Sequence, residues 1–287
     1  MASDRPLVLA LRGDGVPDYL VGGKAAALDR VIAAGSPVPP CGAITVEAYR
    51  AFVSSAPVAG FLASLQASPI PDASTHAEAR AAVDAVFTSA PLPDAVQRAI
   101  ADIATLADAC PVSVRSSATA EDLAGASFAG QYRSLLSVEQ AEVERAVRLV
   151  WASLWHPAPR AYRALRSISE RSMAMGVLVM QMVEPRTSGV LFTTDPTGPA
   201  TDVRLEVVEG LGEALVSGEA TPDVLVAPRE HAAETFGRHD PVYEQLTRDA
   251  LALEVELGAP QDIEWAEAGS VYWILQSRPI TTSSGID

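Results

Sequence analysis

The sequence has little positive charge and few residues of the kinds that build metal or redox centres. Its 287 residues include 21 Lys and Arg against 36 Asp and Glu, which gives a formal net charge of −15. Nucleic acids and anionic membranes both attract basic surfaces, so neither is an expected partner. The two cysteines, Cys41 and Cys110, are far apart and form no C-x-x-C motif, which favours reduced residues over a metal site or a nucleophile.

Long apolar runs and a secretion signal are also lacking. The N-terminus has no charged segment followed by an apolar one, and the longest apolar run, Met173 to Val183, is too short to cross a bilayer. Nearly half of the residues (48%) are nevertheless hydrophobic, enough to bury a large core. The sequence therefore predicts a folded, cytoplasmic enzyme.

The two halves of the chain differ in their hydrophobic periodicity. Helical spacing dominates the first half, including a helix that opens at Gly22-Gly23, a helix with Thr45 as its N-cap, and a helix over 139–155. Strand patterns dominate the second half, at 177–183, 189–193, 204–208 and 224–227, and a final hairpin pairs 262–266 with 271–278. We expect an α/β (α+β) protein with a helix-rich lobe over 1–176, a sheet-rich lobe over 177–280 and a tail over 281–287.

Two segments of the first half have the composition of phosphate-binding elements. Lys24 follows a glycine pair at a helix start, where backbone N–H groups and the helix dipole both favour an anion. A solvated lysine beside a Gly-Gly helix entry is the more common explanation of that pattern alone. The loop from Arg115 to Gln131 follows a short strand and offers an arginine, hydroxyls and two glycines, Gly125 and Gly130, that suit a lid over a triphosphate.

The predicted final hairpin contains polar residues that could bind a metal ion. Gln276 and Arg278 are two residues apart on one strand, and Asp262 and Glu264 are two apart on the preceding strand, so each pair shares a face. Oxygen ligands of this type suit Mg²⁺ that also binds phosphate oxygens. Spacing alone leaves this interpretation and an ordinary edge hairpin equally open.

Taken in order, these segments resemble one family. The chain is similar, over about 21–280, to the ATP-binding domain shared by phosphoenolpyruvate synthase, pyruvate phosphate dikinase and rifampicin phosphotransferase. The segments that carry the resemblance are Val21-Gly-Gly-Lys24, Val38-Pro-Pro40, 111–123, 126–131, Trp151-Ala-Ser-Leu154, Gln181-Met-Val183, 188–193, Gly210-Leu-Gly-Glu213, Asp262-Ile-Glu-Trp265 and Leu275-Gln-Ser-Arg-Pro279.

The resemblance implies an ATP-grasp fold of two lobes, with ATP in the cleft between them. It implies that Lys24, Arg115 and Arg278 act on the phosphates, and that Glu264 and Gln276 bind Mg²⁺. The other implied nucleotide contacts are Thr119 and Gly130 in the phosphate loop and lid, Gln181, Met182 and Val183 beside adenine, and Glu213 at the ribose or phosphates.

Family members continue into a domain whose histidine accepts the phosphate, and no such motif is present here. The four histidines, His76, His156, His231 and His239, lie in unremarkable contexts, and we expect them at the surface. The leading hypothesis is a domain that cleaves ATP and passes a phosphoryl or pyrophosphoryl group to a histidine of a carrier domain or subunit, for transfer to a small-molecule acceptor. The alternatives are a stand-alone kinase that phosphorylates a small molecule directly, and an ATP sensor without turnover.

Overall fold

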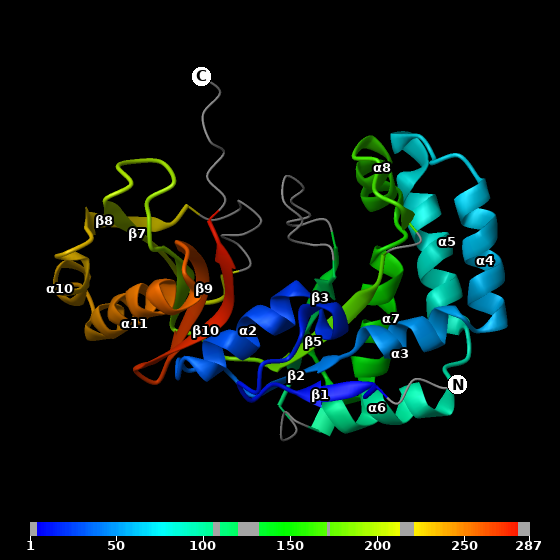
Figure 1. Ribbon diagram of the computed structural model, residues 1–287, viewed down its shortest axis with the longest axis horizontal. Coiled ribbons are helices and arrows are strands. Elements are labelled where there is room, and N and C mark those ends of the chain that lie inside the picture. Colours follow the sequence, from blue (N-terminus) through cyan, green and yellow to red (C-terminus); the bar gives the residue numbers. More distant parts are fainter. Residues whose placement is uncertain (1–4, 106–109, 120–131, 171–172, 213–220, 281–287) are drawn as a thin grey trace. The chain divides into compact units, whose positions relative to one another are not determined.

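The chain forms two compact units, seen in a computed structural model that describes residues 5–105, 110–119, 132–170, 173–212 and 221–280 (Figure 1). The first unit takes its described residues from Met1–Leu11, Val16–Ala26 and Pro40–Met182, and the second from Arg12–Gly15, Ala27–Pro39 and Val183–Asp287. Each unit has one five-stranded sheet, and every strand pairing in both sheets is antiparallel. The mixed helix and sheet content agrees with the α+β class expected from the sequence.

The sheet of the first unit has the strand order β1-β2-β5-β3-β4. Along β3, alternate residues such as Val112 and Val114 join the apolar core, while Arg115 and Ser117 lie on the opposite face. The strands are β1 (Val8–Ala10), β2 (Cys41–Ile44), β3 (Val112–Ala118), β4 (Ser134–Val138) and β5 (Met175–Gln181).

Helices of the first unit supply most of its core. The aromatic residues Phe52, Phe87 and Trp151 meet at its centre, with ring centroids 5.4 Å apart for Phe52 and Trp151 and 5.6 Å apart for Phe52 and Phe87. The helices are α1 (Asp18–Val21), α2 (Gly23–Ala33, which continues into the second unit), α3 (Val46–Val53), α4 (Ala56–Ala67), α5 (His76–Ser89), α6 (Asp94–Ala104), α7 (Val143–Ser153) and α8 (Pro157–Leu165), with short 3-10 turns at Ala73–Thr75 and Gln140–Glu142.

The sheet of the second unit has the order β10-β9-β6-β7-β8. Helix α11 (Pro241–Leu257) lies against β9 and β10, orange beside red in Figure 1, and Tyr243 meets Trp265 edge to face. The strands are β6 (Thr187–Phe192), β7 (Asp202–Glu209), β8 (Asp223–Pro228), β9 (Gln261–Ala268) and β10 (Val271–Pro279), and a short helix α10 (Ala232–Gly237) contacts β8.

One strand belongs to a different sheet from the one that the sequence suggested. The strand expected over 177–183 is β5, and it pairs with β2 on one side and β3 on the other, inside the first sheet. The compact units accordingly divide after Met182. The scheme of two lobes over 1–176 and 177–280 with a tail over 281–287 stays a prediction about domains, and the tail lies outside the described residues.

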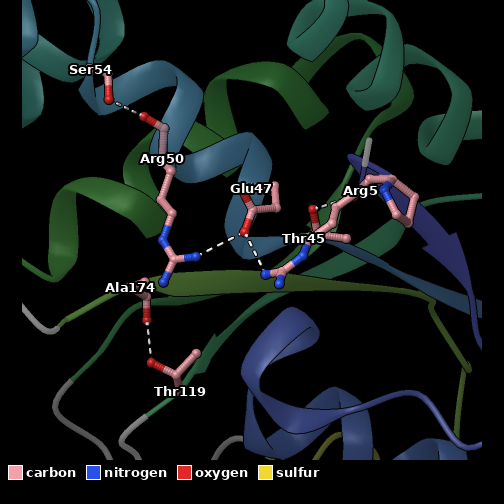
Figure 2. A network of polar contacts seen from close by, with 8 residues as sticks. Arg5, Thr45, Glu47, Arg50, Ser54, Thr119 and Ala174 are labelled. Atoms are coloured by element: carbon pink, nitrogen blue, oxygen red, sulfur yellow. Dashed lines mark hydrogen bonds and ion pairs between the residues drawn. The ribbon is translucent and has the colours of Figure 1, made fainter. Parts of the chain in front are cut away.

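Thr45 illustrates a correction at the level of one side chain. It occupies the N-cap position of α3, as predicted, but its hydroxyl makes no capping hydrogen bond. The hydroxyl instead donates to the carbonyl oxygen of Pro6 at 2.8 Å (Figure 2). This hydrogen bond holds the segment before β1 against the start of α3. The hydroxyl therefore donates to a distant carbonyl group instead of accepting a hydrogen bond from a local N–H group of the helix.

None of the helices in the described part of the chain is both long and apolar enough to cross a membrane.

Candidate active site

The entry to α2 is pressed closely against the end of β3. Gly22 has φ +82°, and a Cβ built there would lie 1.8 Å from the carbonyl oxygen of Ser117. The Ser117 hydroxyl accepts a hydrogen bond from the N–H of Ala25 at 3.1 Å. A second glycine, Gly176 of β5, leaves room for the Val21 carbonyl, which a Cβ at that position would approach to 2.4 Å. The glycines thus allow a helix start to sit on the sheet.

This arrangement brings three predicted phosphate residues to one region of the first unit. Lys24 lies in the first turn of α2, beside the N–H group that Ser117 binds. Arg115 shares the Ser117 face of β3 because the two are separated by one residue. Thr119 follows β3 directly, and both its N–H and its hydroxyl donate to the carbonyl of Ala174, at 3.2 and 3.3 Å (Figure 2).

The segment predicted to border adenine forms the end of β5 and the residues after it. The N–H of Gln181 donates to Pro40 at 2.9 Å, and the N–H of Met182 donates to Pro111 at 2.9 Å. These two amide groups are therefore committed to the protein backbone. Recognition of a base by this segment would have to use its carbonyl groups or Val183, which the unit division places with the second unit.

The final hairpin brings the predicted metal ligands directly opposite each other. Gln276 of β10 faces Glu264 of β9, and Arg278 faces Asp262, with a bulge between Ile274 and Gln276. Gln276 is buried and Glu264 is half-buried. The shared face inferred from spacing is thus present in the structure.

Arg278 is held by a carboxylate that the site prediction did not include. Oδ2 of Asp262 lies 2.7 Å from Nε and 2.6 Å from Nη2 of Arg278. Burial raises the pKa of Asp262, Arg278 opposes that shift, and Glu264 and Glu206 add to it. The two-residue spacing of Asp262 and Glu264 signalled a common face, but only the pairing register identifies the partner of Arg278.

Two further charged residues lie in the same rows of the sheet. Val190 of the central strand β6 pairs with Glu206 of β7 on one side and with Glu264 of β9 on the other. In the same way, Phe192 pairs with Arg204 on one side and with Asp262 on the other. Nε of Arg204 binds Glu206 at 2.7 Å. The sequence showed only an alternating strand here, so these residues were missed.

Glu264 and Gln276 fit part of a Mg²⁺ site by their chemistry. Both present oxygen donors, and their cross-strand register places them side by side. Within the described ranges, no group of three or more His, Cys, Asp or Glu side chains could hold a metal ion. Mg²⁺ commonly takes one or two protein ligands and completes its shell with phosphate oxygens and water.

Some predicted residues lie outside the described part of the chain. They are Gly130 and the rest of the proposed lid, 124–131, and Glu213. Their roles stay predictions.

The prediction for the histidines was wrong at one position. His156, at the N-cap of α8, is only 6% exposed, and its Nε2 lies 2.8 Å from Oδ1 of Asp84 on α5. Burial lowers its pKa, and the hydrogen bond to Asp84 opposes that shift. Within the described part of the chain, Cys41 and Cys110 are not joined in a disulfide; Cys41 is buried and Cys110 is exposed.

Comparison with known proteins identifies the class to which this arrangement belongs. Residues 18–239 match the family described as pyruvate phosphate dikinase, AMP/ATP-binding domain. The chain belongs to this family, which confirms the resemblance seen in its motifs and supports ATP as its ligand.

Its relatives have diverse names. The chain is 41% identical to phosphoenolpyruvate synthase of Aeropyrum pernix over 73% of its length, and 37% identical to rifampicin phosphotransferase of a Streptomyces species over 91%. It is 35% identical to prodigiosin synthesizing transferase PigC of Serratia marcescens over 97%. All three names are those of enzymes. The chain spans 27%, 34% and 33% of these proteins, respectively, about a third or less of each.

Proposed function

We propose that this chain is the ATP-handling part of a phosphotransferase with an ATP-grasp fold. It cleaves ATP and transfers a phosphoryl or pyrophosphoryl group to a histidine on a separate carrier domain or subunit, which passes the group to a small-molecule acceptor. The observation that carries the proposal is the register of the final hairpin, which sets Glu264 opposite Gln276 and Asp262 opposite Arg278.

The names of the relatives support a division of labour. Three proteins with three different named activities share with this chain about a third or less of their length, and the shared part matches an AMP/ATP-binding domain. A common segment among enzymes with different products is expected to perform a common step. The use of ATP is that step, and the acceptor is chosen by the remainder of each enzyme.

Phosphoryl transfer needs positioning and charge stabilisation more than covalent chemistry from the protein. In our proposal, Lys24 and Arg115 hold the phosphates, and Thr119 lines the phosphate loop. Arg278, oriented by Asp262, neutralises charge that develops on the transferred group. Glu264 and Gln276 would hold Mg²⁺, which would supply positive charge to offset the negative charge of the phosphates.

Product analysis tests the proposal directly. The chain is incubated with Mg²⁺ and ATP labelled at either the β or the γ phosphate, with and without a candidate carrier protein, and nucleotides and proteins are separated. We expect acid-labile label on the carrier, as a phosphohistidine gives. ADP as product would define phosphoryl transfer, whereas AMP, with both labels on the carrier, would define pyrophosphoryl transfer.

Two outcomes would contradict the proposal. A phosphorylated small molecule made by the chain alone would indicate a direct kinase. ATP binding without nucleotide turnover, in the presence of every candidate carrier and acceptor, would indicate a sensor.

A further inference from the structure

A partly buried ionic cluster lies next to β4, the strand that pairs with β3 and so with Arg115. It joins His156 at the start of α8, Asp84 of α5 and Arg133, which directly precedes β4. His156 Nε2 is 2.8 Å from Asp84 Oδ1, and Arg133 Nη1 is 3.1 Å from Asp84 Oδ2. The two oxygens of one carboxylate thus bind two different segments.

Arg133 is fixed through its backbone as well as its side chain. Its N–H donates to the hydroxyl of Ser153, the last residue of α7, at 3.1 Å. Ser153 is only 1% exposed, and its own hydroxyl donates to the carbonyl of Val150 at 2.6 Å. Two helices, α5 and α7, therefore hold Arg133 directly, and His156 acts on it through Asp84.

The next residue connects this cluster to the candidate site. Ser134 is the register partner of Arg115, and this is the last pair of the β3–β4 ladder, which already has an irregularity between Val112 and Val114. On its other side, β3 pairs with β5 without interruption from Val112 to Ala118. The pairing with β4 is therefore the less regular of the two strand pairings that hold Arg115. The position of β4 at this point depends on how residues 133 and 134 are held.

We infer that Asp84, Arg133 and His156 form a brace that positions Arg115 for phosphate binding. None of the three touches the nucleotide in this account; they act through Ser134 and the edge of β3. The inference rests on the proposed function, because it assigns Arg115 to the phosphates of ATP.

The side chains of Arg133 and Asp84 are 21% and 22% exposed, so their ion pair is partly sheltered from water. Such a pair is expected to be stronger than one at the open surface. A loss of the brace is expected to weaken nucleotide binding by roughly three- to tenfold, which corresponds to about 0.6–1.4 kcal/mol.

The brace also has a built-in dependence on pH. The imidazole of His156 faces Asp84 and is near the guanidinium groups of Arg133 and Arg80. A proton on His156 adds a second cation that competes with Arg133 for one carboxylate. Acid is therefore expected to weaken the hold of Asp84 on Arg133.

The test measures affinity for Mg²⁺ with a non-hydrolysable ATP analogue by calorimetry. The variants are Arg133→Gln, Asp84→Asn and the double variant, with Arg50→Gln as a matched control. Arg50 pairs with Glu47 at 2.8 Å on α3, in the same unit (Figure 2). We expect each single variant and the double variant to lose a similar, roughly three- to tenfold, affinity. The control is expected to bind as wild type.

Thermal unfolding of the same proteins separates positioning from stability. If Arg133→Gln melts at a lower temperature but its folded form binds the analogue with wild-type affinity, the brace is merely structural and the inference is wrong. If wild type itself does not bind the analogue, the proposed function fails as well. Wild-type binding with an unaffected Arg133→Gln variant overturns the brace alone.

A pH series tests the part assigned to His156. Affinity is compared in wild type and His156→Gln between about pH 7.5 and about pH 4.5, a range that extends below the ordinary histidine pKa because burial lowers the pKa of His156. Titration of the nucleotide affects both proteins equally. A steeper loss in wild type supports the brace, whereas identical slopes would remove His156 from it.

Discussion

We expect replacement of Asp262 by Asn to lower the rate of turnover while the second unit keeps its stability. The change keeps the shape of the side chain but removes the charge that holds Nε and Nη2 of Arg278 at 2.7 and 2.6 Å. If Arg278 acts on the transition state, its orientation matters more for rate than for ATP affinity. A hydrogen bond to a charged group contributes about 1.5–3 kcal/mol. We therefore expect kcat to fall by roughly ten- to hundredfold while the affinity for Mg·ATP stays within about twofold.

The same variant is expected to remain stable. Arg278 is 43% exposed, so its loss of a partner leaves no fully buried cation, and the cost should stay within about 1 kcal/mol. Burial raises the pKa of Asp262 in the folded state. The folded state then binds a proton more tightly than the unfolded state, and this group's contribution to stability falls as pH rises from about 3.9 through the raised value. Asn removes that slope.

The assays are turnover with the carrier or acceptor supplied, calorimetric ATP binding, and urea unfolding at several pH values. Asp223→Asn is the control, because Asp223 is an exposed carboxylate at the start of β8 in the same sheet. A wild-type kcat for Asp262→Asn would show that Arg278 needs no anchor. Loss of ATP binding together with rate would show that the pair serves binding, and the transition-state assignment would be wrong.

Three further predictions concern other parts of the chain. Gly22→Ala should destabilise the protein by several kcal/mol in thermal unfolding, because the added Cβ would meet Ser117. Gly35→Ala, at the same φ of +82° but in open space, should cost only about 1 kcal/mol, and equal effects would refute the close approach. If Glu264 and Gln276 hold Mg²⁺ only together with the phosphates, EDTA should sharply reduce ATP affinity in calorimetry. Unchanged affinity would remove the metal assignment. The free energy of unfolding should fall as pH drops below about 6.5, because burial lowers the pKa of His156 and the unfolded state then takes up more protons. His156→Gln should reduce this dependence on pH, and an unaltered dependence would assign it to other groups.

The sequence predicted the long, periodic elements well. The helix expected over 139–155 consists of the 3-10 turn Gln140–Glu142 and α7, Val143–Ser153. The final hairpin was expected over 262–266 and 271–278 and is Gln261–Ala268 with Val271–Pro279. Strong periodicity and a turn signal are local properties, so one segment is enough to reveal them. The short strands β1 and β2 were missed because three or four residues carry no measurable period.

Features that depend on distant partners were the ones the sequence did not reveal. His156 was expected at the surface because nothing near it in sequence indicates that Asp84, on another helix, shares its environment. The pairing of β5 was not apparent for the same reason, since its neighbours β2 and β3 come much earlier in the chain. Asp262 was seen as a neighbour of Glu264 but not as the partner of Arg278, because a hairpin's register is set by its turn and bulge.

The way the chain is divided between its units has a consequence for how it can fold. Residues 12–15 and 27–39 belong to the second unit although they are synthesised among segments of the first. The segment 27–39 has a partner that is synthesised much later, because the carbonyl of Pro37 accepts a hydrogen bond from the N–H of Ile274 in β10 at 2.8 Å. This early segment cannot form that hydrogen bond until Ile274 has been synthesised, and such distant contacts raise the contact order and slow folding. A shortened chain that ends after Met182 would retain all five strands of the first sheet, yet leave the later turns of α2 and the segment that follows them without their own unit.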